Sequence, residues 1–142
     1  MSESSYYIED LKPGMSESYT RTVTEADVDL FGAVTGDMNP LHFNEEYARQ
    51  TVFRGRIAHG MLTTSYLSTV LGTRMPGPGS IFISANVRFK APVRIGDTVT
   101  ATCTVRDINL HRKRAVFDCI VHVGKTVVVE GEANIMVPSR NA

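Results

Sequence analysis

Residues 58–72 read Ala58-His59-Gly60-Met61-Leu62-Thr63-Thr64-Ser65-Tyr66-Leu67-Ser68-Thr69-Val70-Leu71-Gly72, and this stretch decides the fold. It has the length of an ordinary helix but contains no Asp, Glu, Lys or Arg. A helix without a charged face is expected to be buried. Its first residues also lack a Ser, Thr, Asp or Asn that could cap the free backbone N–H groups. We therefore expect a buried central helix whose N-terminal donors remain available to a ligand.

After Pro76-Gly77-Pro78-Gly79, the apolar residues change from helical spacing to strict alternation, which is typical of β-strands. Short connections that contain Gly96-Asp97 and Gly124-Lys125 predict an antiparallel meander with one apolar and one wet face. The apolar positions are Ile81, Ile83, Ala85, Val87, Phe89; Val99, Ala101, Cys103, Val105; Ala115, Phe117, Cys119, Val121, Val123; and Val127, Val129, Ala133, Ile135, Val137. Such a sheet and the uncharged helix bury their apolar surfaces together when the sheet curls around the helix, which is an α+β arrangement.

Before the central helix, the sequence predicts a first strand from Ser18 to Val23 and then a helix. Thr24 can cap the free N–H groups of that helix, and Asp27 stands at the acidic position of a capping box. Gly36 stands where a left-handed residue usually ends a helix. The helix is therefore expected to run from Thr24 to just before Gly36.

The connection that follows this helix carries an acid and an imidazole five positions apart, Asp37 and His42. The Asn39-Pro40 step favours a turn, and Asn44 is predicted to cap another short helix. Asp37 is thus expected directly after one helix, and His42 just before the next. Both side chains belong to one tight connection that can aim them at a single point, and we interpret this stretch as the reactive centre.

Length and composition limit the classes of protein to which this chain can belong. The 142 residues predict one domain, 1–142, and equal numbers of basic and acidic residues, 15 each, argue against a nucleic-acid or membrane-surface partner. The chain shows no signal peptide and no long apolar run, so we expect a soluble, cytoplasmic protein. Cys103 and Cys119 are expected to be buried free thiols, because their spacing suits neither a disulfide framework nor a zinc site.

The order of these elements, with Gly36-Asp37-Met38-Asn39-Pro40-Leu41-His42 preceding Ala58-His59-Gly60-Met61-Leu62, resembles the MaoC-like hydratases of the hot-dog superfamily. Among them it is most similar to the short R-specific enoyl-CoA hydratases. The resemblance covers nearly the whole chain and implies the hot-dog fold, an acyl-CoA thioester as substrate and partner, a homodimer joined at the sheet edges, and no cofactor beyond the coenzyme A of the substrate. It also implies a place in fatty-acid metabolism and in the supply of polyhydroxyalkanoate precursors.

The resemblance also implies roles for individual residues. Asp37 and His42 would hold the attacking water, and Gly60 would supply a backbone N–H to the thioester oxygen. The chain has Asn44-Glu45 where many members have Asp-Pro, and Met38 within the motif; both departures concern substrate detail rather than the proposed catalytic atoms.

The resemblance also implies that Ser68 lies close to the site, and Asn39 and His59 are predicted to lie on its substrate side. Each has a structural alternative that the sequence leaves open. Asn39 can form an Asx turn that fixes the loop, His59 can pack locally, and Ser68 can bond back to a carbonyl one turn earlier. No site in the chain shows the sequence spacing of metal ligands, so no metal is expected.

The chemistry of hydration fits these residue types. Adding water to an enoyl thioester requires a positioned water, a proton for the α-carbon and a site for negative charge on the thioester oxygen. An acid and an imidazole can serve the first two needs, and an uncapped helix start at Gly60 can serve the third. Together with the resemblance, which implies the substrate and the R configuration, this chemistry predicts R-specific hydration of trans-2-enoyl-CoA. The alternatives are a hot-dog thioesterase, which does not need an adjacent His, and a non-catalytic acyl-CoA-binding module.

Overall fold

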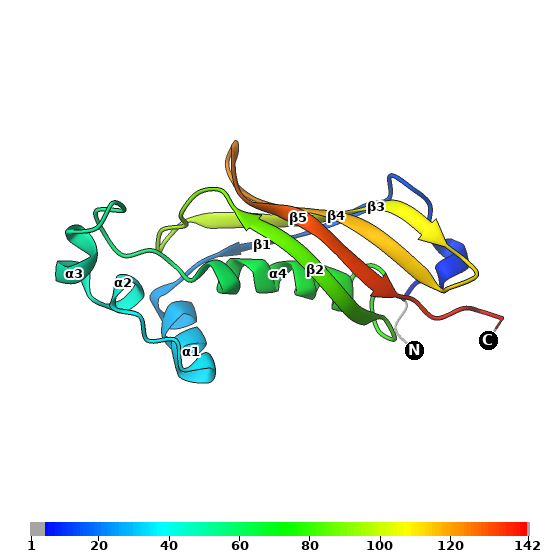
Figure 1. Ribbon diagram of the computed structural model, residues 1–142, viewed down its shortest axis with the longest axis horizontal. Helices are drawn as coiled ribbons and strands as arrows, with labels where there is room; N and C mark the ends of the chain where they lie inside the picture. Colours follow the sequence, from blue (N-terminus) through cyan, green and yellow to red (C-terminus); the bar gives the residue numbers. More distant parts are fainter. Residues whose placement is uncertain (1–4, 142) are drawn as a thin grey trace.

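The computed structural model describes residues 5–141, which form one curled antiparallel sheet around a central helix (Figure 1). The helix is α4, and the strand order in the sheet is β1-β3-β4-β5-β2. The elements are β1 (Ser16–Thr22), α4 (Gly60–Thr73), β2 (Ile81–Phe89), β3 (Thr98–Asn109), β4 (Arg114–Val123) and β5 (Thr126–Met136), with a short 3₁₀ helix η1 (Ile8–Asp10) at the start. This is the predicted α+β hot-dog fold, which is confirmed.

The core lies between α4 and the inner face of the sheet. The alternating apolar residues of β3 and β4 point into it as predicted, and Cys103 pairs directly with Cys119 across these two strands. Both cysteines are buried free thiols, and their Sγ atoms lie 3.8 Å apart. One side of α4 supplies the rest of this core, through Leu62, Thr63, Tyr66, Leu67, Val70 and Leu71.

The strand order departs from the predicted four-strand meander. Strands β3, β4 and β5 form a meander, but β2 pairs with β5 at one edge and β1 pairs with β3 at the other. The link from β2 to β3 contains Pro92 and crosses the start of α4, where the Val93 carbonyl accepts a hydrogen bond from the Ala58 N–H. A crossing link cannot act as a hairpin turn, so β2 and β3 end up at separate positions in the sheet.

The central helix is buried on one side only, which corrects the prediction that it would be buried all round. Its opposite side is exposed at Met61, Ser65, Ser68 and Gly72. The predicted apolar face of β2 is likewise left largely uncovered, because one helix is too narrow to cover the edge strand as well as the centre of the sheet. In a single chain, one side of α4 and the apolar face of β2 therefore remain exposed, and exposed apolar surface favours contact with another molecule.

Three short helices lie beyond one end of the sheet, next to the start of α4 (Figure 1). They are α1 (Glu25–Thr35), α2 (Pro40–Phe43) and α3 (Glu45–Arg49). The predicted caps are confirmed: Thr24 and Asp27 form a capping box, Gly36 is left-handed with φ 78°, and the Asn44 side chain accepts from the Tyr47 N–H. His42 lies just before α3, the helix capped by Asn44, as predicted, but it belongs to the short helix α2, where only a turn was expected.

Within residues 5–141, no helix is both long enough and apolar enough to cross a membrane.

Candidate active site

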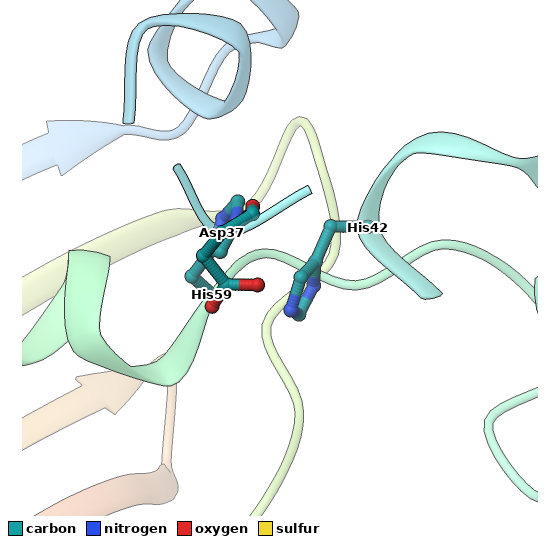
Figure 2. Close-up of side chains that lie close together, drawn as sticks. All are labelled: Asp37, His42 and His59. Atoms are coloured by element: carbon teal, nitrogen blue, oxygen red, sulfur yellow. The ribbon is translucent and has the colours of Figure 1, made fainter. Parts of the chain in front are cut away.

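A pocket of about 440 Å³ opens at the N-terminal end of α4. Its walls come from the loop after α1, from α2, from the first turn of α4 and from the link between β2 and β3. Four of the residues expected at the site line it, namely Asp37, His42, His59 and Gly60. Figure 2 shows three of these side chains, Asp37, His42 and His59, lying close together. The fold thus brings two separate sequence motifs to one place.

Asp37 is held at the exit of α1 by a network of local hydrogen bonds. The left-handed Gly36 ends the helix, the Asp37 N–H donates to Thr35 Oγ1, and Asp37 Oδ1 accepts from the Asn39 N–H at 3.3 Å. The carboxylate remains exposed and faces the pocket. A carboxylate in this position can accept a hydrogen bond from a water molecule in the pocket.

Asn39 acts locally, as its structural alternative predicts. Its side-chain oxygen accepts from the Leu41 N–H at 3.0 Å, which caps α2, and Pro40 follows at the first helical position. Asn39 does not line the pocket of the single chain. Its observed contact fixes the turn between Asp37 and His42.

His42 is buried, and its two ring nitrogens have different surroundings. Nδ1 lies 2.7 Å from the Ile57 carbonyl oxygen. A carbonyl only accepts hydrogen bonds, so Nδ1 carries the proton, and Nε2 of the neutral ring keeps a lone pair for the pocket. Burial lowers the pKa of His42 below its usual value, which is partly opposed by the Ile57 hydrogen bond and the Asp37 charge. The neutral ring is therefore favoured, with Nε2 as an acceptor.

Arg56 fixes the backbone of His42 from behind. Its Nε donates to the His42 carbonyl oxygen at 2.7 Å, and its guanidinium pairs with Glu25 of α1 at 2.9 Å. Its role in the structure is to tie the start of α1 to α2, and no motif in the sequence indicates this.

Gly60 is the first residue of α4, and no side chain caps this end of the helix, as predicted. Among residues 5–141 the Gly60 N–H has no hydrogen-bond acceptor. A Cβ atom at this position would lie 2.6 Å from the ring of Phe89, so glycine lets the β2 edge approach the helix start. Phe89 was expected only as part of the apolar face of a strand, but it lines the pocket. The pairing of β2 with β5, which places it there, is not encoded in local sequence.

Ser68 lies on the exposed side of α4, two turns beyond Gly60, and does not line the pocket of the single chain. The structure therefore separates it from the cluster formed by Asp37, His42, His59 and Gly60.

The candidate ligand atoms of Asp37, His42 and His59 lie within 4.8 Å of one another, a grouping that the sequence spacing did not reveal. Two imidazoles and a carboxylate are common metal ligands. Here, however, the two rings stack with centroids 3.9 Å apart and planes inclined by 30°. Ring lone pairs lie in the ring planes, so stacked rings direct them side by side rather than at one ion. This arrangement suits a water-holding pair better than a metal centre.

Comparison with known proteins agrees with this geometry. The family model described as MaoC like domain matches residues 10–127. An (R)-specific enoyl-CoA hydratase of Rhodospirillum rubrum is 52% identical over 95% of this chain and 94% of that protein. A 3-hydroxybutyryl-CoA dehydratase of Methylorubrum extorquens is 45% identical over 94% of this chain and 85% of its own length. The solved (R)-hydratase of A. caviae, described as involved in PHA biosynthesis, superimposes with a TM-score of 0.88 at 34% identity, covering 92% of this chain and 99% of that one.

The fold and the site define a hot-dog protein of the hydratase type. The chain belongs to the MaoC-like family.

Proposed function

We propose that this protein adds water to trans-2-enoyl-CoA to form R-3-hydroxyacyl-CoA and catalyses the reverse dehydration. The observation that carries the proposal is that Asp37, His42 and the free N–H of Gly60 line one pocket. The reaction is supported by the Rhodospirillum (R)-specific enoyl-CoA hydratase and the Methylorubrum 3-hydroxybutyryl-CoA dehydratase, and the R configuration of the product by the Rhodospirillum relative.

In this proposal Asp37 and the neutral His42 hold the attacking water between them. Both groups present acceptors, the Asp37 carboxylate and His42 Nε2, so the water donates its two hydrogens and directs an oxygen lone pair at the substrate. The Ile57 carbonyl keeps the His42 proton on Nδ1, which prevents Nε2 from competing as a donor. The water is thus both positioned and polarised before reaction.

Gly60 stabilises the negative charge that develops on the thioester oxygen. As the water oxygen bonds to C3, the electrons of the C2–C3 double bond move toward C2 and the thioester oxygen, giving an enolate. The Gly60 N–H at the start of α4 donates to that oxygen, and the helix dipole favours negative charge there. One water proton passes to the Asp37–His42 pair and is returned to C2. The product gains one molecule of water, with no oxidation or reduction.

Turnover of crotonyl-CoA tests this function. Hydration removes the enoyl absorbance without releasing a thiol. A thioesterase would release free coenzyme A, which a thiol reagent detects, and a binding module would bind the thioester without turnover. Chiral analysis of the product then checks the R configuration.

We further propose that a second copy of the chain covers the open side of α4 and the edge of β2. Support comes from the contrast between the sheet edges: β2 exposes Ile81, Phe82 and Ile83, whereas hydroxyl pairs such as Thr22–Thr98 mark the β1 edge. An uncovered apolar edge strand favours pairing with another chain. A second copy related by a two-fold axis would bury the exposed sides of α4 and β2 on both chains.

An edge substitution tests this assembly. Ile83→Glu places a charge on the exposed edge and should convert the dimer to a monomer in light scattering at micromolar concentration. Ile120→Glu is the matched control, because Ile120 is a partly exposed residue on the central strand β4 and its replacement should leave the dimer intact. A wild-type protein that is monomeric would contradict this proposal.

The proposed reaction uses protein groups and the coenzyme A of its substrate, without another cofactor. The A. caviae relative is described as involved in PHA biosynthesis, and we propose the same supply of precursors here. The two cysteines are free thiols, as is usual in reducing compartments, which supports a cytoplasmic location.

A further inference from the structure

His59 was expected to contact substrate, but the structure surrounds it with other side chains. Only 1% of its surface is exposed. Its ring stacks on the His42 ring at 3.9 Å and packs against Phe31 at 4.8 Å and Phe43 at 5.5 Å between ring centroids. His59 is thus a buried residue that packs behind Asp37 and His42, the two residues proposed to hold the water.

Neither nitrogen of His59 is available to a substrate. Nε2 lies 2.9 Å from the backbone carbonyl oxygen of Asp37, which only accepts, so Nε2 carries the proton. Nδ1 then holds the lone pair, and it is buried without a partner among the described residues. A buried polar atom without a partner is uncommon in folded proteins and calls for an explanation. Here the imidazole is retained although half of its hydrogen-bonding capacity is unused.

We propose that His59 is a positioning residue that holds Asp37 and His42 in a fixed orientation relative to each other. Its Nε2–H holds the backbone of Asp37, while its ring face fixes the plane of His42. The proposal rests on the function proposed above and deepens it, because it explains how groups from two elements keep one geometry. A phenylalanine would supply only the ring and an amide only the donor, whereas histidine supplies both.

The two contacts of His59 act on different motions. The Ile57 hydrogen bond holds one edge of the His42 ring but allows the ring to tilt about that bond. Stacking against His59 blocks the tilt and keeps Nε2 directed at the pocket. The hydrogen bond to the Asp37 carbonyl stops the loop after α1 from moving away from α4. A displacement of about 1 Å at a catalytic group can lower turnover by about 10²-fold, so both restraints matter.

His59 also contributes to the surroundings that tune His42. The charged and titratable groups around His42 are the Asp37 carboxylate, the Arg56 guanidinium and His59 itself, and burial is the main influence on it. The His59 ring supplies part of that burial. Its replacement by a smaller, non-aromatic side chain would admit water and raise the pKa of His42 toward its usual value.

Two variants separate the two contacts. His59→Phe keeps a ring against His42 but loses the donor to Asp37, and His59→Gln keeps an N–H donor of similar reach but loses the ring. We expect each to lower kcat for crotonyl-CoA by about 10-fold or more, with KM changed by less than about threefold. Both variants lose the charge interaction by which His59 lowers the pKa of His42, and His59→Gln also loses burial. The acid limb of the kcat/KM profile should therefore move to higher pH in both variants, and further in His59→Gln.

Phe31→Leu is the matched control. It removes another ring that packs on His59 but does not line the pocket. Its kcat should stay within about twofold of the wild type. Equal losses in Phe31→Leu and in both His59 variants would reduce His59 to a packing residue and overturn the proposal. A rise of KM without a fall of kcat would also overturn it, because His59 would then be a substrate contact.

An NMR titration of the histidine rings separates this inference from the proposed reaction. The midpoint for His42 should rise in His59→Gln relative to wild type and to Phe31→Leu, whether or not the protein turns over crotonyl-CoA. A wild type that does not hydrate crotonyl-CoA would refute the proposed function and leave this coupling measurable. An unchanged His42 midpoint in His59→Gln would refute the coupling even if the wild type is active.

Discussion

The start of α4 and the middle of the sheet differ in whether side chains are buried and backbone groups have hydrogen-bond partners. In the sheet, inward side chains such as Phe117 and Val121 are fully buried, and the backbone is paired with a neighbouring strand. At the start of α4, the Gly60 N–H has no acceptor among the described residues and the Asp37 carboxylate is exposed. Polar groups left free by the fold are the groups that a substrate can use.

Two glycines show the same contrast. A Cβ at Gly60 would approach the ring of Phe89, an exposed side chain that can turn away. A Cβ at Gly131 in β5 would fall on the backbone carbonyl of Asn86 in β2, which cannot move without breaking the pairing of these strands. The site therefore tolerates local change that the sheet does not.

The largest expected effect is the loss of catalysis without loss of fold. Asp37→Asn and His42→Ala should each lower kcat by about 10²-fold or more, as for other general acid–base groups. The double variant should be little worse than either single variant, because both residues act on one water. Asp29→Asn, at an exposed acid of α1 outside the pocket, is the control. Crotonyl-CoA kinetics measure the effect, and a double variant much worse than either single one would contradict a shared water.

In the sheet we expect a loss of stability without a loss of catalysis. Phe117→Ala removes a fully buried ring from β4 and should lower the free energy of unfolding by about 3 to 5 kcal/mol. The kcat per folded molecule should remain near that of the wild type, because Phe117 does not line the pocket. Urea unfolding and active-site titration measure the two quantities. A kcat that falls in step with stability would remove the distinction between the two regions.

A smaller effect is expected at the helix start. Gly60→Pro removes the proposed oxyanion donor and should lower kcat by about 10²-fold, with a smaller change in KM. Proline is tolerated at the first helical position, and His59 already has the extended backbone, φ −60° and ψ 132°, that suits a residue before proline. Gly60→Ala is the control, since it adds a Cβ beside Phe89 but keeps the N–H. Circular dichroism verifies the fold, and equal kcat values in the two variants would show that the oxygen is held elsewhere.

The smallest expected effect is a shift on the pH axis. Burial lowers the pKa of His42 below 6.5, so the neutral ring that accepts from water should persist at lower pH, and the acid limb of kcat/KM should lie below pH 6.5. The same shift means that His42 binds a proton more readily in the unfolded chain. Its contribution to stability is therefore intact above pH 6.5 and is lost as the pH falls through the lowered value. NMR titration of the His42 ring in the folded protein and in the protein unfolded by urea checks the direction. A His42 midpoint in the folded protein at or above that in the unfolded protein would be the opposite result.

Local features of the fold could be predicted from the sequence because short-range chemistry determines them. The capping box of Thr24 and Asp27, the left-handed Gly36 and the alternation in β3 and β4 depend only on neighbouring residues. Which strand pairs with which is a long-range choice. Alternation defines the apolar face of a strand but not its neighbour, so the place of β2 beside β5 could not be foreseen.

The site divides in the same way. The turn between two helices predicted that Asp37 and His42 point to one place, whereas the place of Gly60 in the same pocket followed from the resemblance to the MaoC-like hydratases. The stacking of His59 on His42 joins residues 17 positions apart in sequence through the packing of α2 against the start of α4. Nothing in the sequence distinguishes a stacked histidine from one that faces the substrate.

The hydrogen-bonded turn around Asp37 has a thermodynamic consequence. Thr35 Oγ1 accepts from the Asp37 N–H, Asp37 Oδ1 accepts from the Asn39 N–H, and Arg56 holds the carbonyl of His42, so the loop is ordered in the free protein. Its conformational entropy is lost during folding rather than at substrate binding. Binding should thus be accompanied by a heat-capacity change that reflects only the apolar surface buried by the acyl chain, without the additional change expected when a disordered loop folds around its ligand.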